Sequence, residues 1–134
     1  MKIDKVVFDS NYYIHLILKN KLEELVYFYS DFNIQIFTCK RQIDEITDVL
    51  TRRKISKYIS ASQEYLNFIQ KITIEIEIDE RFDRAPDVKD NYLFDLCYTV
   101  KSYCLVTGDK PLLNMKSVNK INILSITAYK KLIK

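Results

Sequence analysis

Short apolar segments of strand length alternate with amphipathic segments along almost the whole chain of 134 residues. Residues 5–8, 34–37, 104–106 and 121–124 predict buried strands, and residues 72–78 alternate strictly, which predicts a strand with one buried face. Apolar residues recur at helical spacing within 14–18, 22–29, 43–50, 55–69 and 93–100, and again from about residue 125. This order predicts an α/β fold with a mainly parallel sheet of about five strands, covered on both faces.

The composition fits a single domain spanning residues 1–134, with 48% hydrophobic and 29% charged residues. The net charge of +3 is too small to indicate nucleic-acid binding by itself. No apolar run approaches the ~18 residues of a membrane span, and the charged N-terminus does not resemble a secretion signal. We therefore expect a cytoplasmic protein. Cys39, Cys97 and Cys104 lie in apolar surroundings and are expected to be reduced core residues.

Acidic residues follow two of the predicted strands. Asp9 comes directly after residues 5–8, and Asp109 comes just after residues 104–106. Parallel α/β sheets bind ligands outside the carboxyl ends of their strands, so these carboxylates face each other if the two strands are neighbours. Glu45, at the edge of an apolar helix stripe, and Asp90, at the start of a helix that runs back across the sheet, are candidates to join them.

Four carboxylates in one cleft would repel each other, and a divalent cation would remove that conflict. Oxygen ligands select hard ions such as Mg²⁺ or Mn²⁺, which polarise a phosphoryl oxygen and lower the pKa of a bound water. Phosphodiester hydrolysis is the chemistry that such a site serves best. The alternative is structural, because Asp9, Asp90 and Asp109 stand where helix-capping Asp is common, and Glu45 alone would be a surface residue.

Gly108 is the only glycine of the chain, where average usage would give about nine. Its place between Thr107 and Asp109 predicts a backbone position that a Cβ would obstruct. A tight turn from strand to helix is the simpler explanation.

Three segments resemble the PIN domain family, in particular the PIN-family toxin components of bacterial toxin–antitoxin systems. Residues 7–11 (VFDSN) resemble the family's opening signature of a hydrophobic residue, Asp, Thr or Ser, and Asn. Residues 43–46 (IDEI) resemble the helix that carries a family acid. The closest match is residues 87–96 (DVKDNYLFDL) followed by residues 105–110 (LVTGDK). The resemblance covers almost the whole chain.

The resemblance implies a three-layer α/β/α sandwich around a parallel sheet, and RNA cleavage that depends on Mg²⁺ or Mn²⁺. The acids that would hold the metal and act in catalysis are Asp9, Glu45, Asp90 and Asp109. The supporting polar groups would be Ser10, Asn11 and Thr107.

Two positions depart from the family pattern. Val88 stands where the family often has Pro, and Pro111 stands where a second Asp is frequent. Loss of that acid would weaken a second metal position, although Pro also suits the first turn of a helix. The role of Asp87 stays open. Asp95 lies about 140° around the helix from Asp90, which argues against the two residues binding the same ion.

Basic residues would hold RNA phosphates if they rim the acidic cleft, and would otherwise form a solvated helix face. They are Lys40, Arg41, Arg52, Arg53 and Lys54. Most of the ten tyrosines are expected in the core or at its boundary, although Tyr12, Tyr13 and Tyr92, near the predicted site, are candidates for base stacking. His15, the only histidine, is not needed by an acid-only metal site.

We therefore expect a divalent-metal-dependent endoribonuclease, the toxin of a type II toxin–antitoxin system. The resemblance further implies an RNA substrate, a cognate antitoxin protein and a homodimer, with no membrane partner. The alternative is a non-catalytic PIN scaffold that binds RNA or a protein partner and uses the acids as caps. A third hypothesis is a phospho-acceptor domain of flavodoxin-like topology, which needs paired acids after the first strand; Asp4 is too far upstream to pair closely with Asp9.

Overall fold

A computed structural model describes residues 4–57 and 62–134 of the chain. The helical elements are α1 (Ser10–Leu18), α2 (Glu24–Phe32), α3 (Lys40–Thr51), α4 (Arg53–Ser56), α5 (Ser62–Ile72), the 3₁₀ turn η1 (Val88–Asp90), α6 (Asn91–Val100), α7 (Lys110–Met115) and α8 (Ile126–Ile133). The strands are β1 (Lys5–Phe8), β2 (Gln35–Thr38), β3 (Ile74–Glu75), β4 (Cys104–Val106), β5 (Ser117–Val118) and β6 (Ile121–Leu124). Among the described residues, no helix combines the length and the apolar character needed to cross a bilayer.

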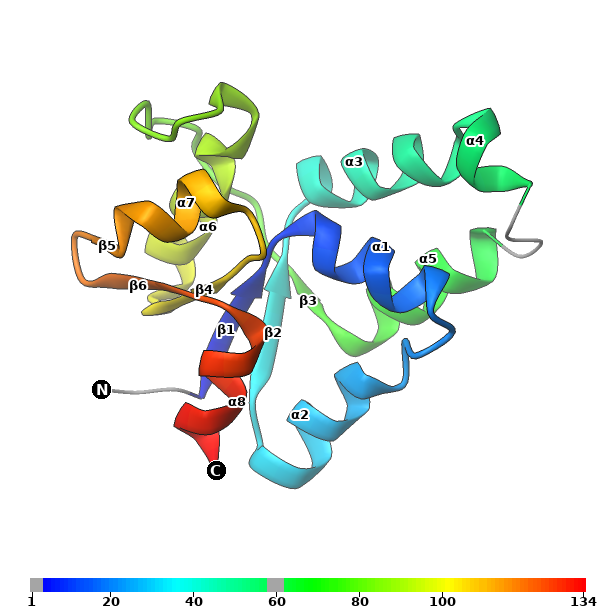
Figure 1. Cartoon of the computed structure of the whole chain (residues 1–134), viewed down its shortest axis with the longest axis horizontal. Coiled ribbons are helices and arrows are strands. Elements are labelled where there is room, and N and C mark those ends of the chain that lie inside the picture. Colours follow the sequence, from blue (N-terminus) through cyan, green and yellow to red (C-terminus); the bar gives the residue numbers. More distant parts are fainter. Residues whose placement is uncertain (1–3, 58–61) are drawn as a thin grey trace.

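The described strands form one six-stranded sheet in the order β3-β2-β1-β4-β6-β5 (Figure 1). Neighbours from β3 to β6 are parallel, and the short β5 pairs with β6 in the antiparallel sense. The chain order of the parallel strands reverses between β1 and β4, which is where open α/β sheets bind ligands. A flavodoxin-like sheet would have its second strand at the edge. Here β3 is at the edge, so the phospho-acceptor hypothesis is wrong in its topology.

Helices cover both faces of the sheet, which confirms the predicted three-layer α/β/α arrangement (Figure 1). Val6 and Phe8 of β1 point into a core shared with α1, α2, α3, α5 and α8, and Val7 points into a second core shared with α6 and α7. All three side chains are 0% exposed. A central parallel strand is buried on both faces, and this is why β1 is apolar without alternation.

The strand predicted at residues 72–78 is shorter in the structure. Helix α5 continues through Ile72, and Thr73 still bonds to the last turn because its N–H and its hydroxyl both donate to Ile69 O, at 3.0 and 2.6 Å. The strand itself is Ile74–Glu75, and one more bond runs from Ile76 N to Thr38 O at 2.9 Å. Ile76 and Ile78 then pack on the α6 core outside the ladder. The alternation therefore overestimated the length of the strand, and it marked a buried side correctly only at Ile76 and Ile78, because Ile74 is 40% exposed.

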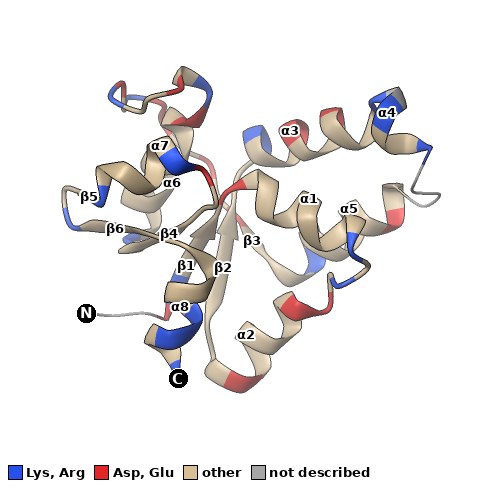
Figure 2. Cartoon of the chain, in the orientation of Figure 1, with Lys and Arg blue, Asp and Glu red and all other residues tan. Residues whose placement is uncertain are grey.

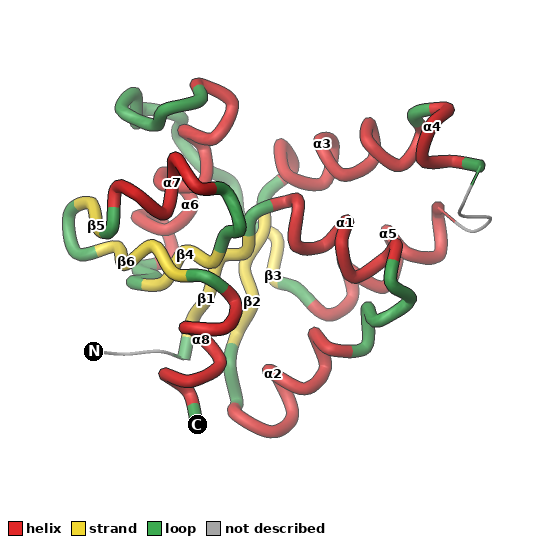
Figure 3. The backbone as a smooth tube through the Cα atoms, in the orientation of Figure 1, coloured by secondary structure: helices red, strands yellow, loops and turns green. Residues whose placement is uncertain are grey.

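The single helix predicted over residues 55–69 is also wrong. Helix α4 ends at Ser56 with Lys57 as its cap, and α5 begins at Ser62. Tyr58 and Ile59, which belonged to that prediction, lie outside the described residues. The strand β5 was not predicted, and most of the chain between β3 and η1 is loop (Figure 3).

Candidate active site

Asp9 lies at the carboxyl end of β1, buried beside the end of β4. Its N–H donates to Val106 O at 2.8 Å, which extends the pairing of the two strands by one residue. Its Oδ1 accepts from Asn11 N at 3.4 Å and caps α1. Its Oδ2 accepts from the Thr107 hydroxyl at 2.7 Å. Asp9 is thus a helix cap and, at the same time, a buried carboxylate at the switch point of the sheet.

Thr107 connects Asp9 to Asp109. The Thr107 hydroxyl donates to Asp9 and accepts from Asp109 N at 3.0 Å. The Asp109 Oδ2 accepts from Leu112 N at 3.0 Å, so Asp109 caps α7, whose first turn contains Pro111. Thr107 is 2% exposed, and its one hydroxyl therefore fixes the relative position of the loops that follow β1 and β4.

Glu45 reaches the same end of the sheet through a buried tyrosine. The Tyr92 hydroxyl donates to Glu45 Oε1 at 2.8 Å and lies 2.9 Å from Ser10 Oγ. Helix α3 is itself anchored by Gln42, whose side-chain amide donates to Phe8 O at 2.6 Å and accepts from Thr38 at 2.7 Å. The hydroxyl of Ser10 therefore supports Glu45 indirectly, through Tyr92.

Neither Gln42 nor the bridging role of Tyr92 was predicted. Gln42 lies in the apolar stripe of α3, where a polar residue must find a partner if it is buried. Tyr92 follows Asp90 on an almost wholly apolar helix, and a buried tyrosine hydroxyl likewise needs a partner. These two signals were present in the sequence, but Phe8, which Gln42 bonds, is 34 residues away, and Glu45, which Tyr92 bonds, is 47 residues away.

Asp90 is the last residue of η1 and directly precedes α6, and its surroundings raise its pKa from 3.8 to about 7. The largest cause is burial, followed by the negative charges of Asp9, Asp87, Asp109 and Glu45. Burial also raises the pKa of Asp9, although the hydrogen bonds from Thr107 and Asn11 oppose this, and the charges of Glu45 and Asp109 add to it.

The four predicted acids therefore lie within electrostatic reach of one another, although they come from four separate parts of the chain. Figure 2 shows acidic stretches at the starts of α1 and α7, at the carboxyl ends of β1 and β4. The ion pairs formed by the described residues involve other carboxylates. The protein thus concentrates negative charge here without neutralising it.

The donors at this site suit a hard divalent ion, because they are carboxylate oxygens with unbalanced charge. The described part of the chain nevertheless contains no group of three or more His, Cys, Asp or Glu side chains already arranged to hold a metal ion. Asp9, Glu45 and Asp109 each direct an oxygen toward a protein donor. The residues fit a Mg²⁺ or Mn²⁺ ion in chemistry, and their side chains would have to draw together around it.

Asp95 and Asp87 have structural roles. Asp95 is 6% exposed, and its carboxylate accepts from Arg81 N at 3.1 Å and from Phe82 N at 3.0 Å. It therefore anchors the long loop before η1, in agreement with the expectation that it points away from the shared ion. Asp87 accepts from Lys89 N at 3.0 Å and caps η1, and its charge also acts on Asp90.

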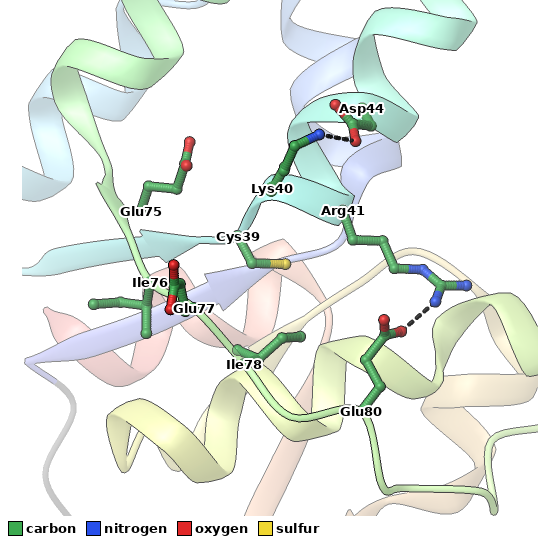
Figure 4. Close-up of a pocket in the computed structure, with 9 residues that line it drawn as sticks. All are labelled: Cys39, Lys40, Arg41, Asp44, Glu75, Ile76, Glu77, Ile78 and Glu80. Atoms are coloured by element: carbon green, nitrogen blue, oxygen red, sulfur yellow. Dashed lines mark hydrogen bonds and ion pairs between the residues drawn. The ribbon is translucent and has the colours of Figure 1, made fainter.

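The predicted basic residues divide into two groups. Lys40 and Arg41 begin α3 and line a hollow of about 730 Å³ beside the carboxyl ends of β2 and β3 (Figure 4). Lys40 pairs with Asp44 at 2.9 Å, and Arg41 pairs with Glu80 (Figure 4). The Arg41 guanidinium also lies over the Tyr92 ring.

The second group, Arg52, Arg53 and Lys54, lies at the other end of α3, about 18 Å along the helix axis. Arg52 pairs with Asp48 at 3.1 Å. The structure therefore places only Lys40 and Arg41 at the acidic end of the sheet.

Tyr13 and Tyr92 are 0% and 1% exposed, so both are core residues, as expected for most of the tyrosines, and neither is available for base stacking. The prediction that a Cβ would be obstructed at Gly108 is wrong, because a Cβ added there would meet nothing within 4 Å. In agreement with the sequence, Cys39, Cys97 and Cys104 are buried and free.

Residues 5–111 match the model of the PIN domain family. No curated protein and no solved structure matches the chain. The matched region contains the four carboxylates, the threonine between two of them and the tyrosine that holds the third. The chain belongs to the PIN domain family, whose members are generally nucleases.

Proposed function

We propose that this chain is a divalent-metal-dependent endoribonuclease and the toxin of a type II toxin–antitoxin system. The observation that supports the proposal is the convergence of Asp9, Glu45, Asp90 and Asp109 at the switch point of the sheet, where the pKa of Asp90 is raised to about 7. Groups of acids that raise one another's pKa occur preferentially at functional sites.

The four carboxylates would hold one or two Mg²⁺ or Mn²⁺ ions. When bound, such an ion would polarise a phosphoryl oxygen with its positive charge and lower the pKa of a water bound to it. Thr107 orients Asp9 and Asp109 together, and Tyr92 orients Glu45. Asp90 lies among the charges of the other three acids, and its carboxylate would be one of the ligands of the ion.

The basic residues at the start of α3 suit the substrate backbone. Arg41 lies over Tyr92, the same residue that holds Glu45, so a phosphate at Arg41 would lie next to the acid cluster. Lys40 is exposed beside it. These two side chains would position the RNA strand, and their partners Glu80 and Asp44 would be displaced when phosphate binds.

A small antitoxin that covers the acidic end of the sheet is the proposed protein partner, and the toxin is proposed to form a homodimer. Suppression of RNA cleavage by the product of a small neighbouring gene, added to the purified protein, would support the toxin role. Cleavage unaffected by that product would leave a ribonuclease without this regulation.

The second candidate is a non-catalytic PIN scaffold that binds RNA or a protein. One observation favours it, namely that no group of metal-ligating side chains is already assembled among the described residues. In that case the acids would serve as caps of α1 and α7 and as a partner of Tyr92.

The test is cleavage of a mixed RNA pool with Mn²⁺ or with EDTA by wild type, Asp90→Asn and Asp83→Asn. Asp83 is an exposed acid of the loop before η1 and provides the matched control. The proposal expects cleavage by wild type and Asp83→Asn with Mn²⁺, and none with EDTA or with Asp90→Asn. Equal cleavage by Asp90→Asn would remove Asp90 from the mechanism.

A further inference from the structure

A second hollow, of about 270 Å³, is lined by residues next to the acid cluster in the sequence, among them Asn11, Thr107 and Gly108. Its walls come from the first turns of α1, from the loop between β4 and α7 and from the start of α8, which meet near the end of β4 (Figure 1). Thr107 and Gly108 line it, and the next residue is Asp109. A group in this hollow would therefore lie next to a phosphate held at the acids.

The lining is apolar with polar groups at its margin. Val106, Ile126 and the half-buried Tyr12 supply the apolar surface, and Asn11, His15 and Ser125 supply hydrogen-bonding groups. No Lys, Arg, Asp or Glu is among the described residues that line it. A phosphate would find no formal cation here, whereas a flat, uncharged ring with polar edges would find both apolar walls and hydrogen-bond partners.

Three polar residues, Asn11, His15 and Ser125, lie at the margin of the hollow. Asn11 and His15 are one helical turn apart on α1, and both are exposed. The Ser125 Oγ accepts from Ala128 N at 3.1 Å, which leaves the hydroxyl hydrogen able to donate to a ligand. The volume is just below the range of drug-sized pockets, so it fits one ring system.

Gly108 gives an independent indication of a ligand. It is the only glycine of the chain, its φ is not positive, and a Cβ would meet nothing within 4 Å. The fold therefore does not need glycine there. Its missing side chain leaves open space at the wall of the hollow, beside Asp109, where a bound molecule would approach the backbone.

We propose that this hollow binds a nucleobase of the RNA strand next to the scissile phosphate. The proposal rests on the proposed nuclease function, and it adds a base-binding subsite that is separate from the acids. Tyr12 and His15 would contact the ring of the base, and Asn11 and Ser125 would hydrogen-bond its edge. A Cβ at Gly108 would meet no atom within 4 Å, so a larger side chain there would extend from the wall of the hollow into free space.

The test uses the imidazole resonances of His15, which need no assignment because His15 is the only histidine. Metal-free wild-type protein is titrated at constant pH with adenosine, guanosine, cytidine and uridine, and with ribose 5-phosphate, which lacks a base. Gly108→Leu fills the hollow, and Asn114→Leu adds the same side chain to the exposed face of α7 as a control.

The proposal expects a saturable shift of the His15 signals with at least one nucleoside and none with ribose 5-phosphate. Gly108→Leu should weaken that binding by about five-fold or more, whereas Asn114→Leu should leave it unchanged. No shift with any nucleoside, an equal shift with ribose 5-phosphate, or full binding by Gly108→Leu would overturn the proposal.

The nucleosides contain no scissile phosphate, so this result is independent of the nuclease test. Nucleoside binding in a protein that cleaves no RNA would support the base site and overturn the nuclease function. Cleavage without nucleoside binding would overturn the base site and leave the nuclease function intact.

Discussion

Replacing Asp90 with Asn should stabilise the metal-free protein while it abolishes catalysis. Asp90 has a pKa of about 7 in the folded protein and about 3.8 without its surroundings, because it is partly buried among Asp9, Asp87, Asp109 and Glu45. The folded state therefore binds the Asp90 proton more tightly than the unfolded state does. Stability of the metal-free protein consequently falls as pH rises from about 4 to about 7, and the Asp90 contribution is constant above that.

The magnitude follows from the same two values. One pH unit of pKa difference corresponds to about 1.36 kcal/mol, so the whole difference would be worth about 4 kcal/mol at pH 8. Asp90 is only partly buried, and solvent screens part of the repulsion. We therefore expect Asp90→Asn to raise the free energy of unfolding by about 1–2 kcal/mol, or the melting temperature by about 3–8 °C.

The measurement is urea unfolding in EDTA at pH 8 and at pH 4, for wild type, Asp90→Asn and the control Asp83→Asn. The advantage of Asp90→Asn should be present at pH 8 and should nearly vanish at pH 4, where wild-type Asp90 is protonated in the folded state. Saturating Mn²⁺ should stabilise wild type and not Asp90→Asn. An Asp90→Asn protein that is less stable than wild type at pH 8 in EDTA would show that ionised Asp90 does not destabilise the folded protein.

Three further substitutions test the supports of the site. Thr107→Val removes the buried hydroxyl between Asp9 and Asp109 and should cost about 1–3 kcal/mol in urea unfolding, together with a loss of cleavage; unchanged stability would contradict its bridging role. Tyr92→Phe keeps the ring and loses the bond to Glu45, so calorimetry should show about 10–100-fold weaker Mn²⁺ binding, and equal affinity would argue against it. Asp95→Ala should release the loop at Arg81 and Phe82, seen as faster limited proteolysis there, and unaltered protection would exclude the anchoring role.

Buried strands such as β1 could be predicted from the sequence, because the pattern that marks them is local. Val6, Val7 and Phe8 form an unbroken apolar run because a central parallel strand is buried on both faces, and that run was recognisable. The extent of β3 was not predictable, because Ile74, Ile76 and Ile78 alternate in an extended segment with or without a ladder partner.

Local sequence features predicted the positions of the acids and of Thr107 and Ser10 beside them, whereas the side chains that hold Glu45 and α3 in place were not predicted. The positions of Asp9 and Asp109 follow from strand ends, which are local features, and their proximity follows from β1 and β4 being neighbours. The roles of Tyr92, Gln42 and Asp95 depend on partners in other segments, and only the structure identifies those partners. The prediction for Gly108 was wrong. Its rarity suggested a position that a Cβ would obstruct, but a Cβ there would meet no atom within 4 Å.

The most direct test of the central claim is a titration of the metal-free protein with Mn²⁺, in which electron paramagnetic resonance measures the free ion. If Asp9 and Asp90 belong to one metal site, Mn²⁺ should bind to wild type and to Asp83→Asn. Binding should be lost in Asp9→Asn and in Asp90→Asn. Mn²⁺ binding that survives both substitutions, or wild type that binds no Mn²⁺, would contradict it.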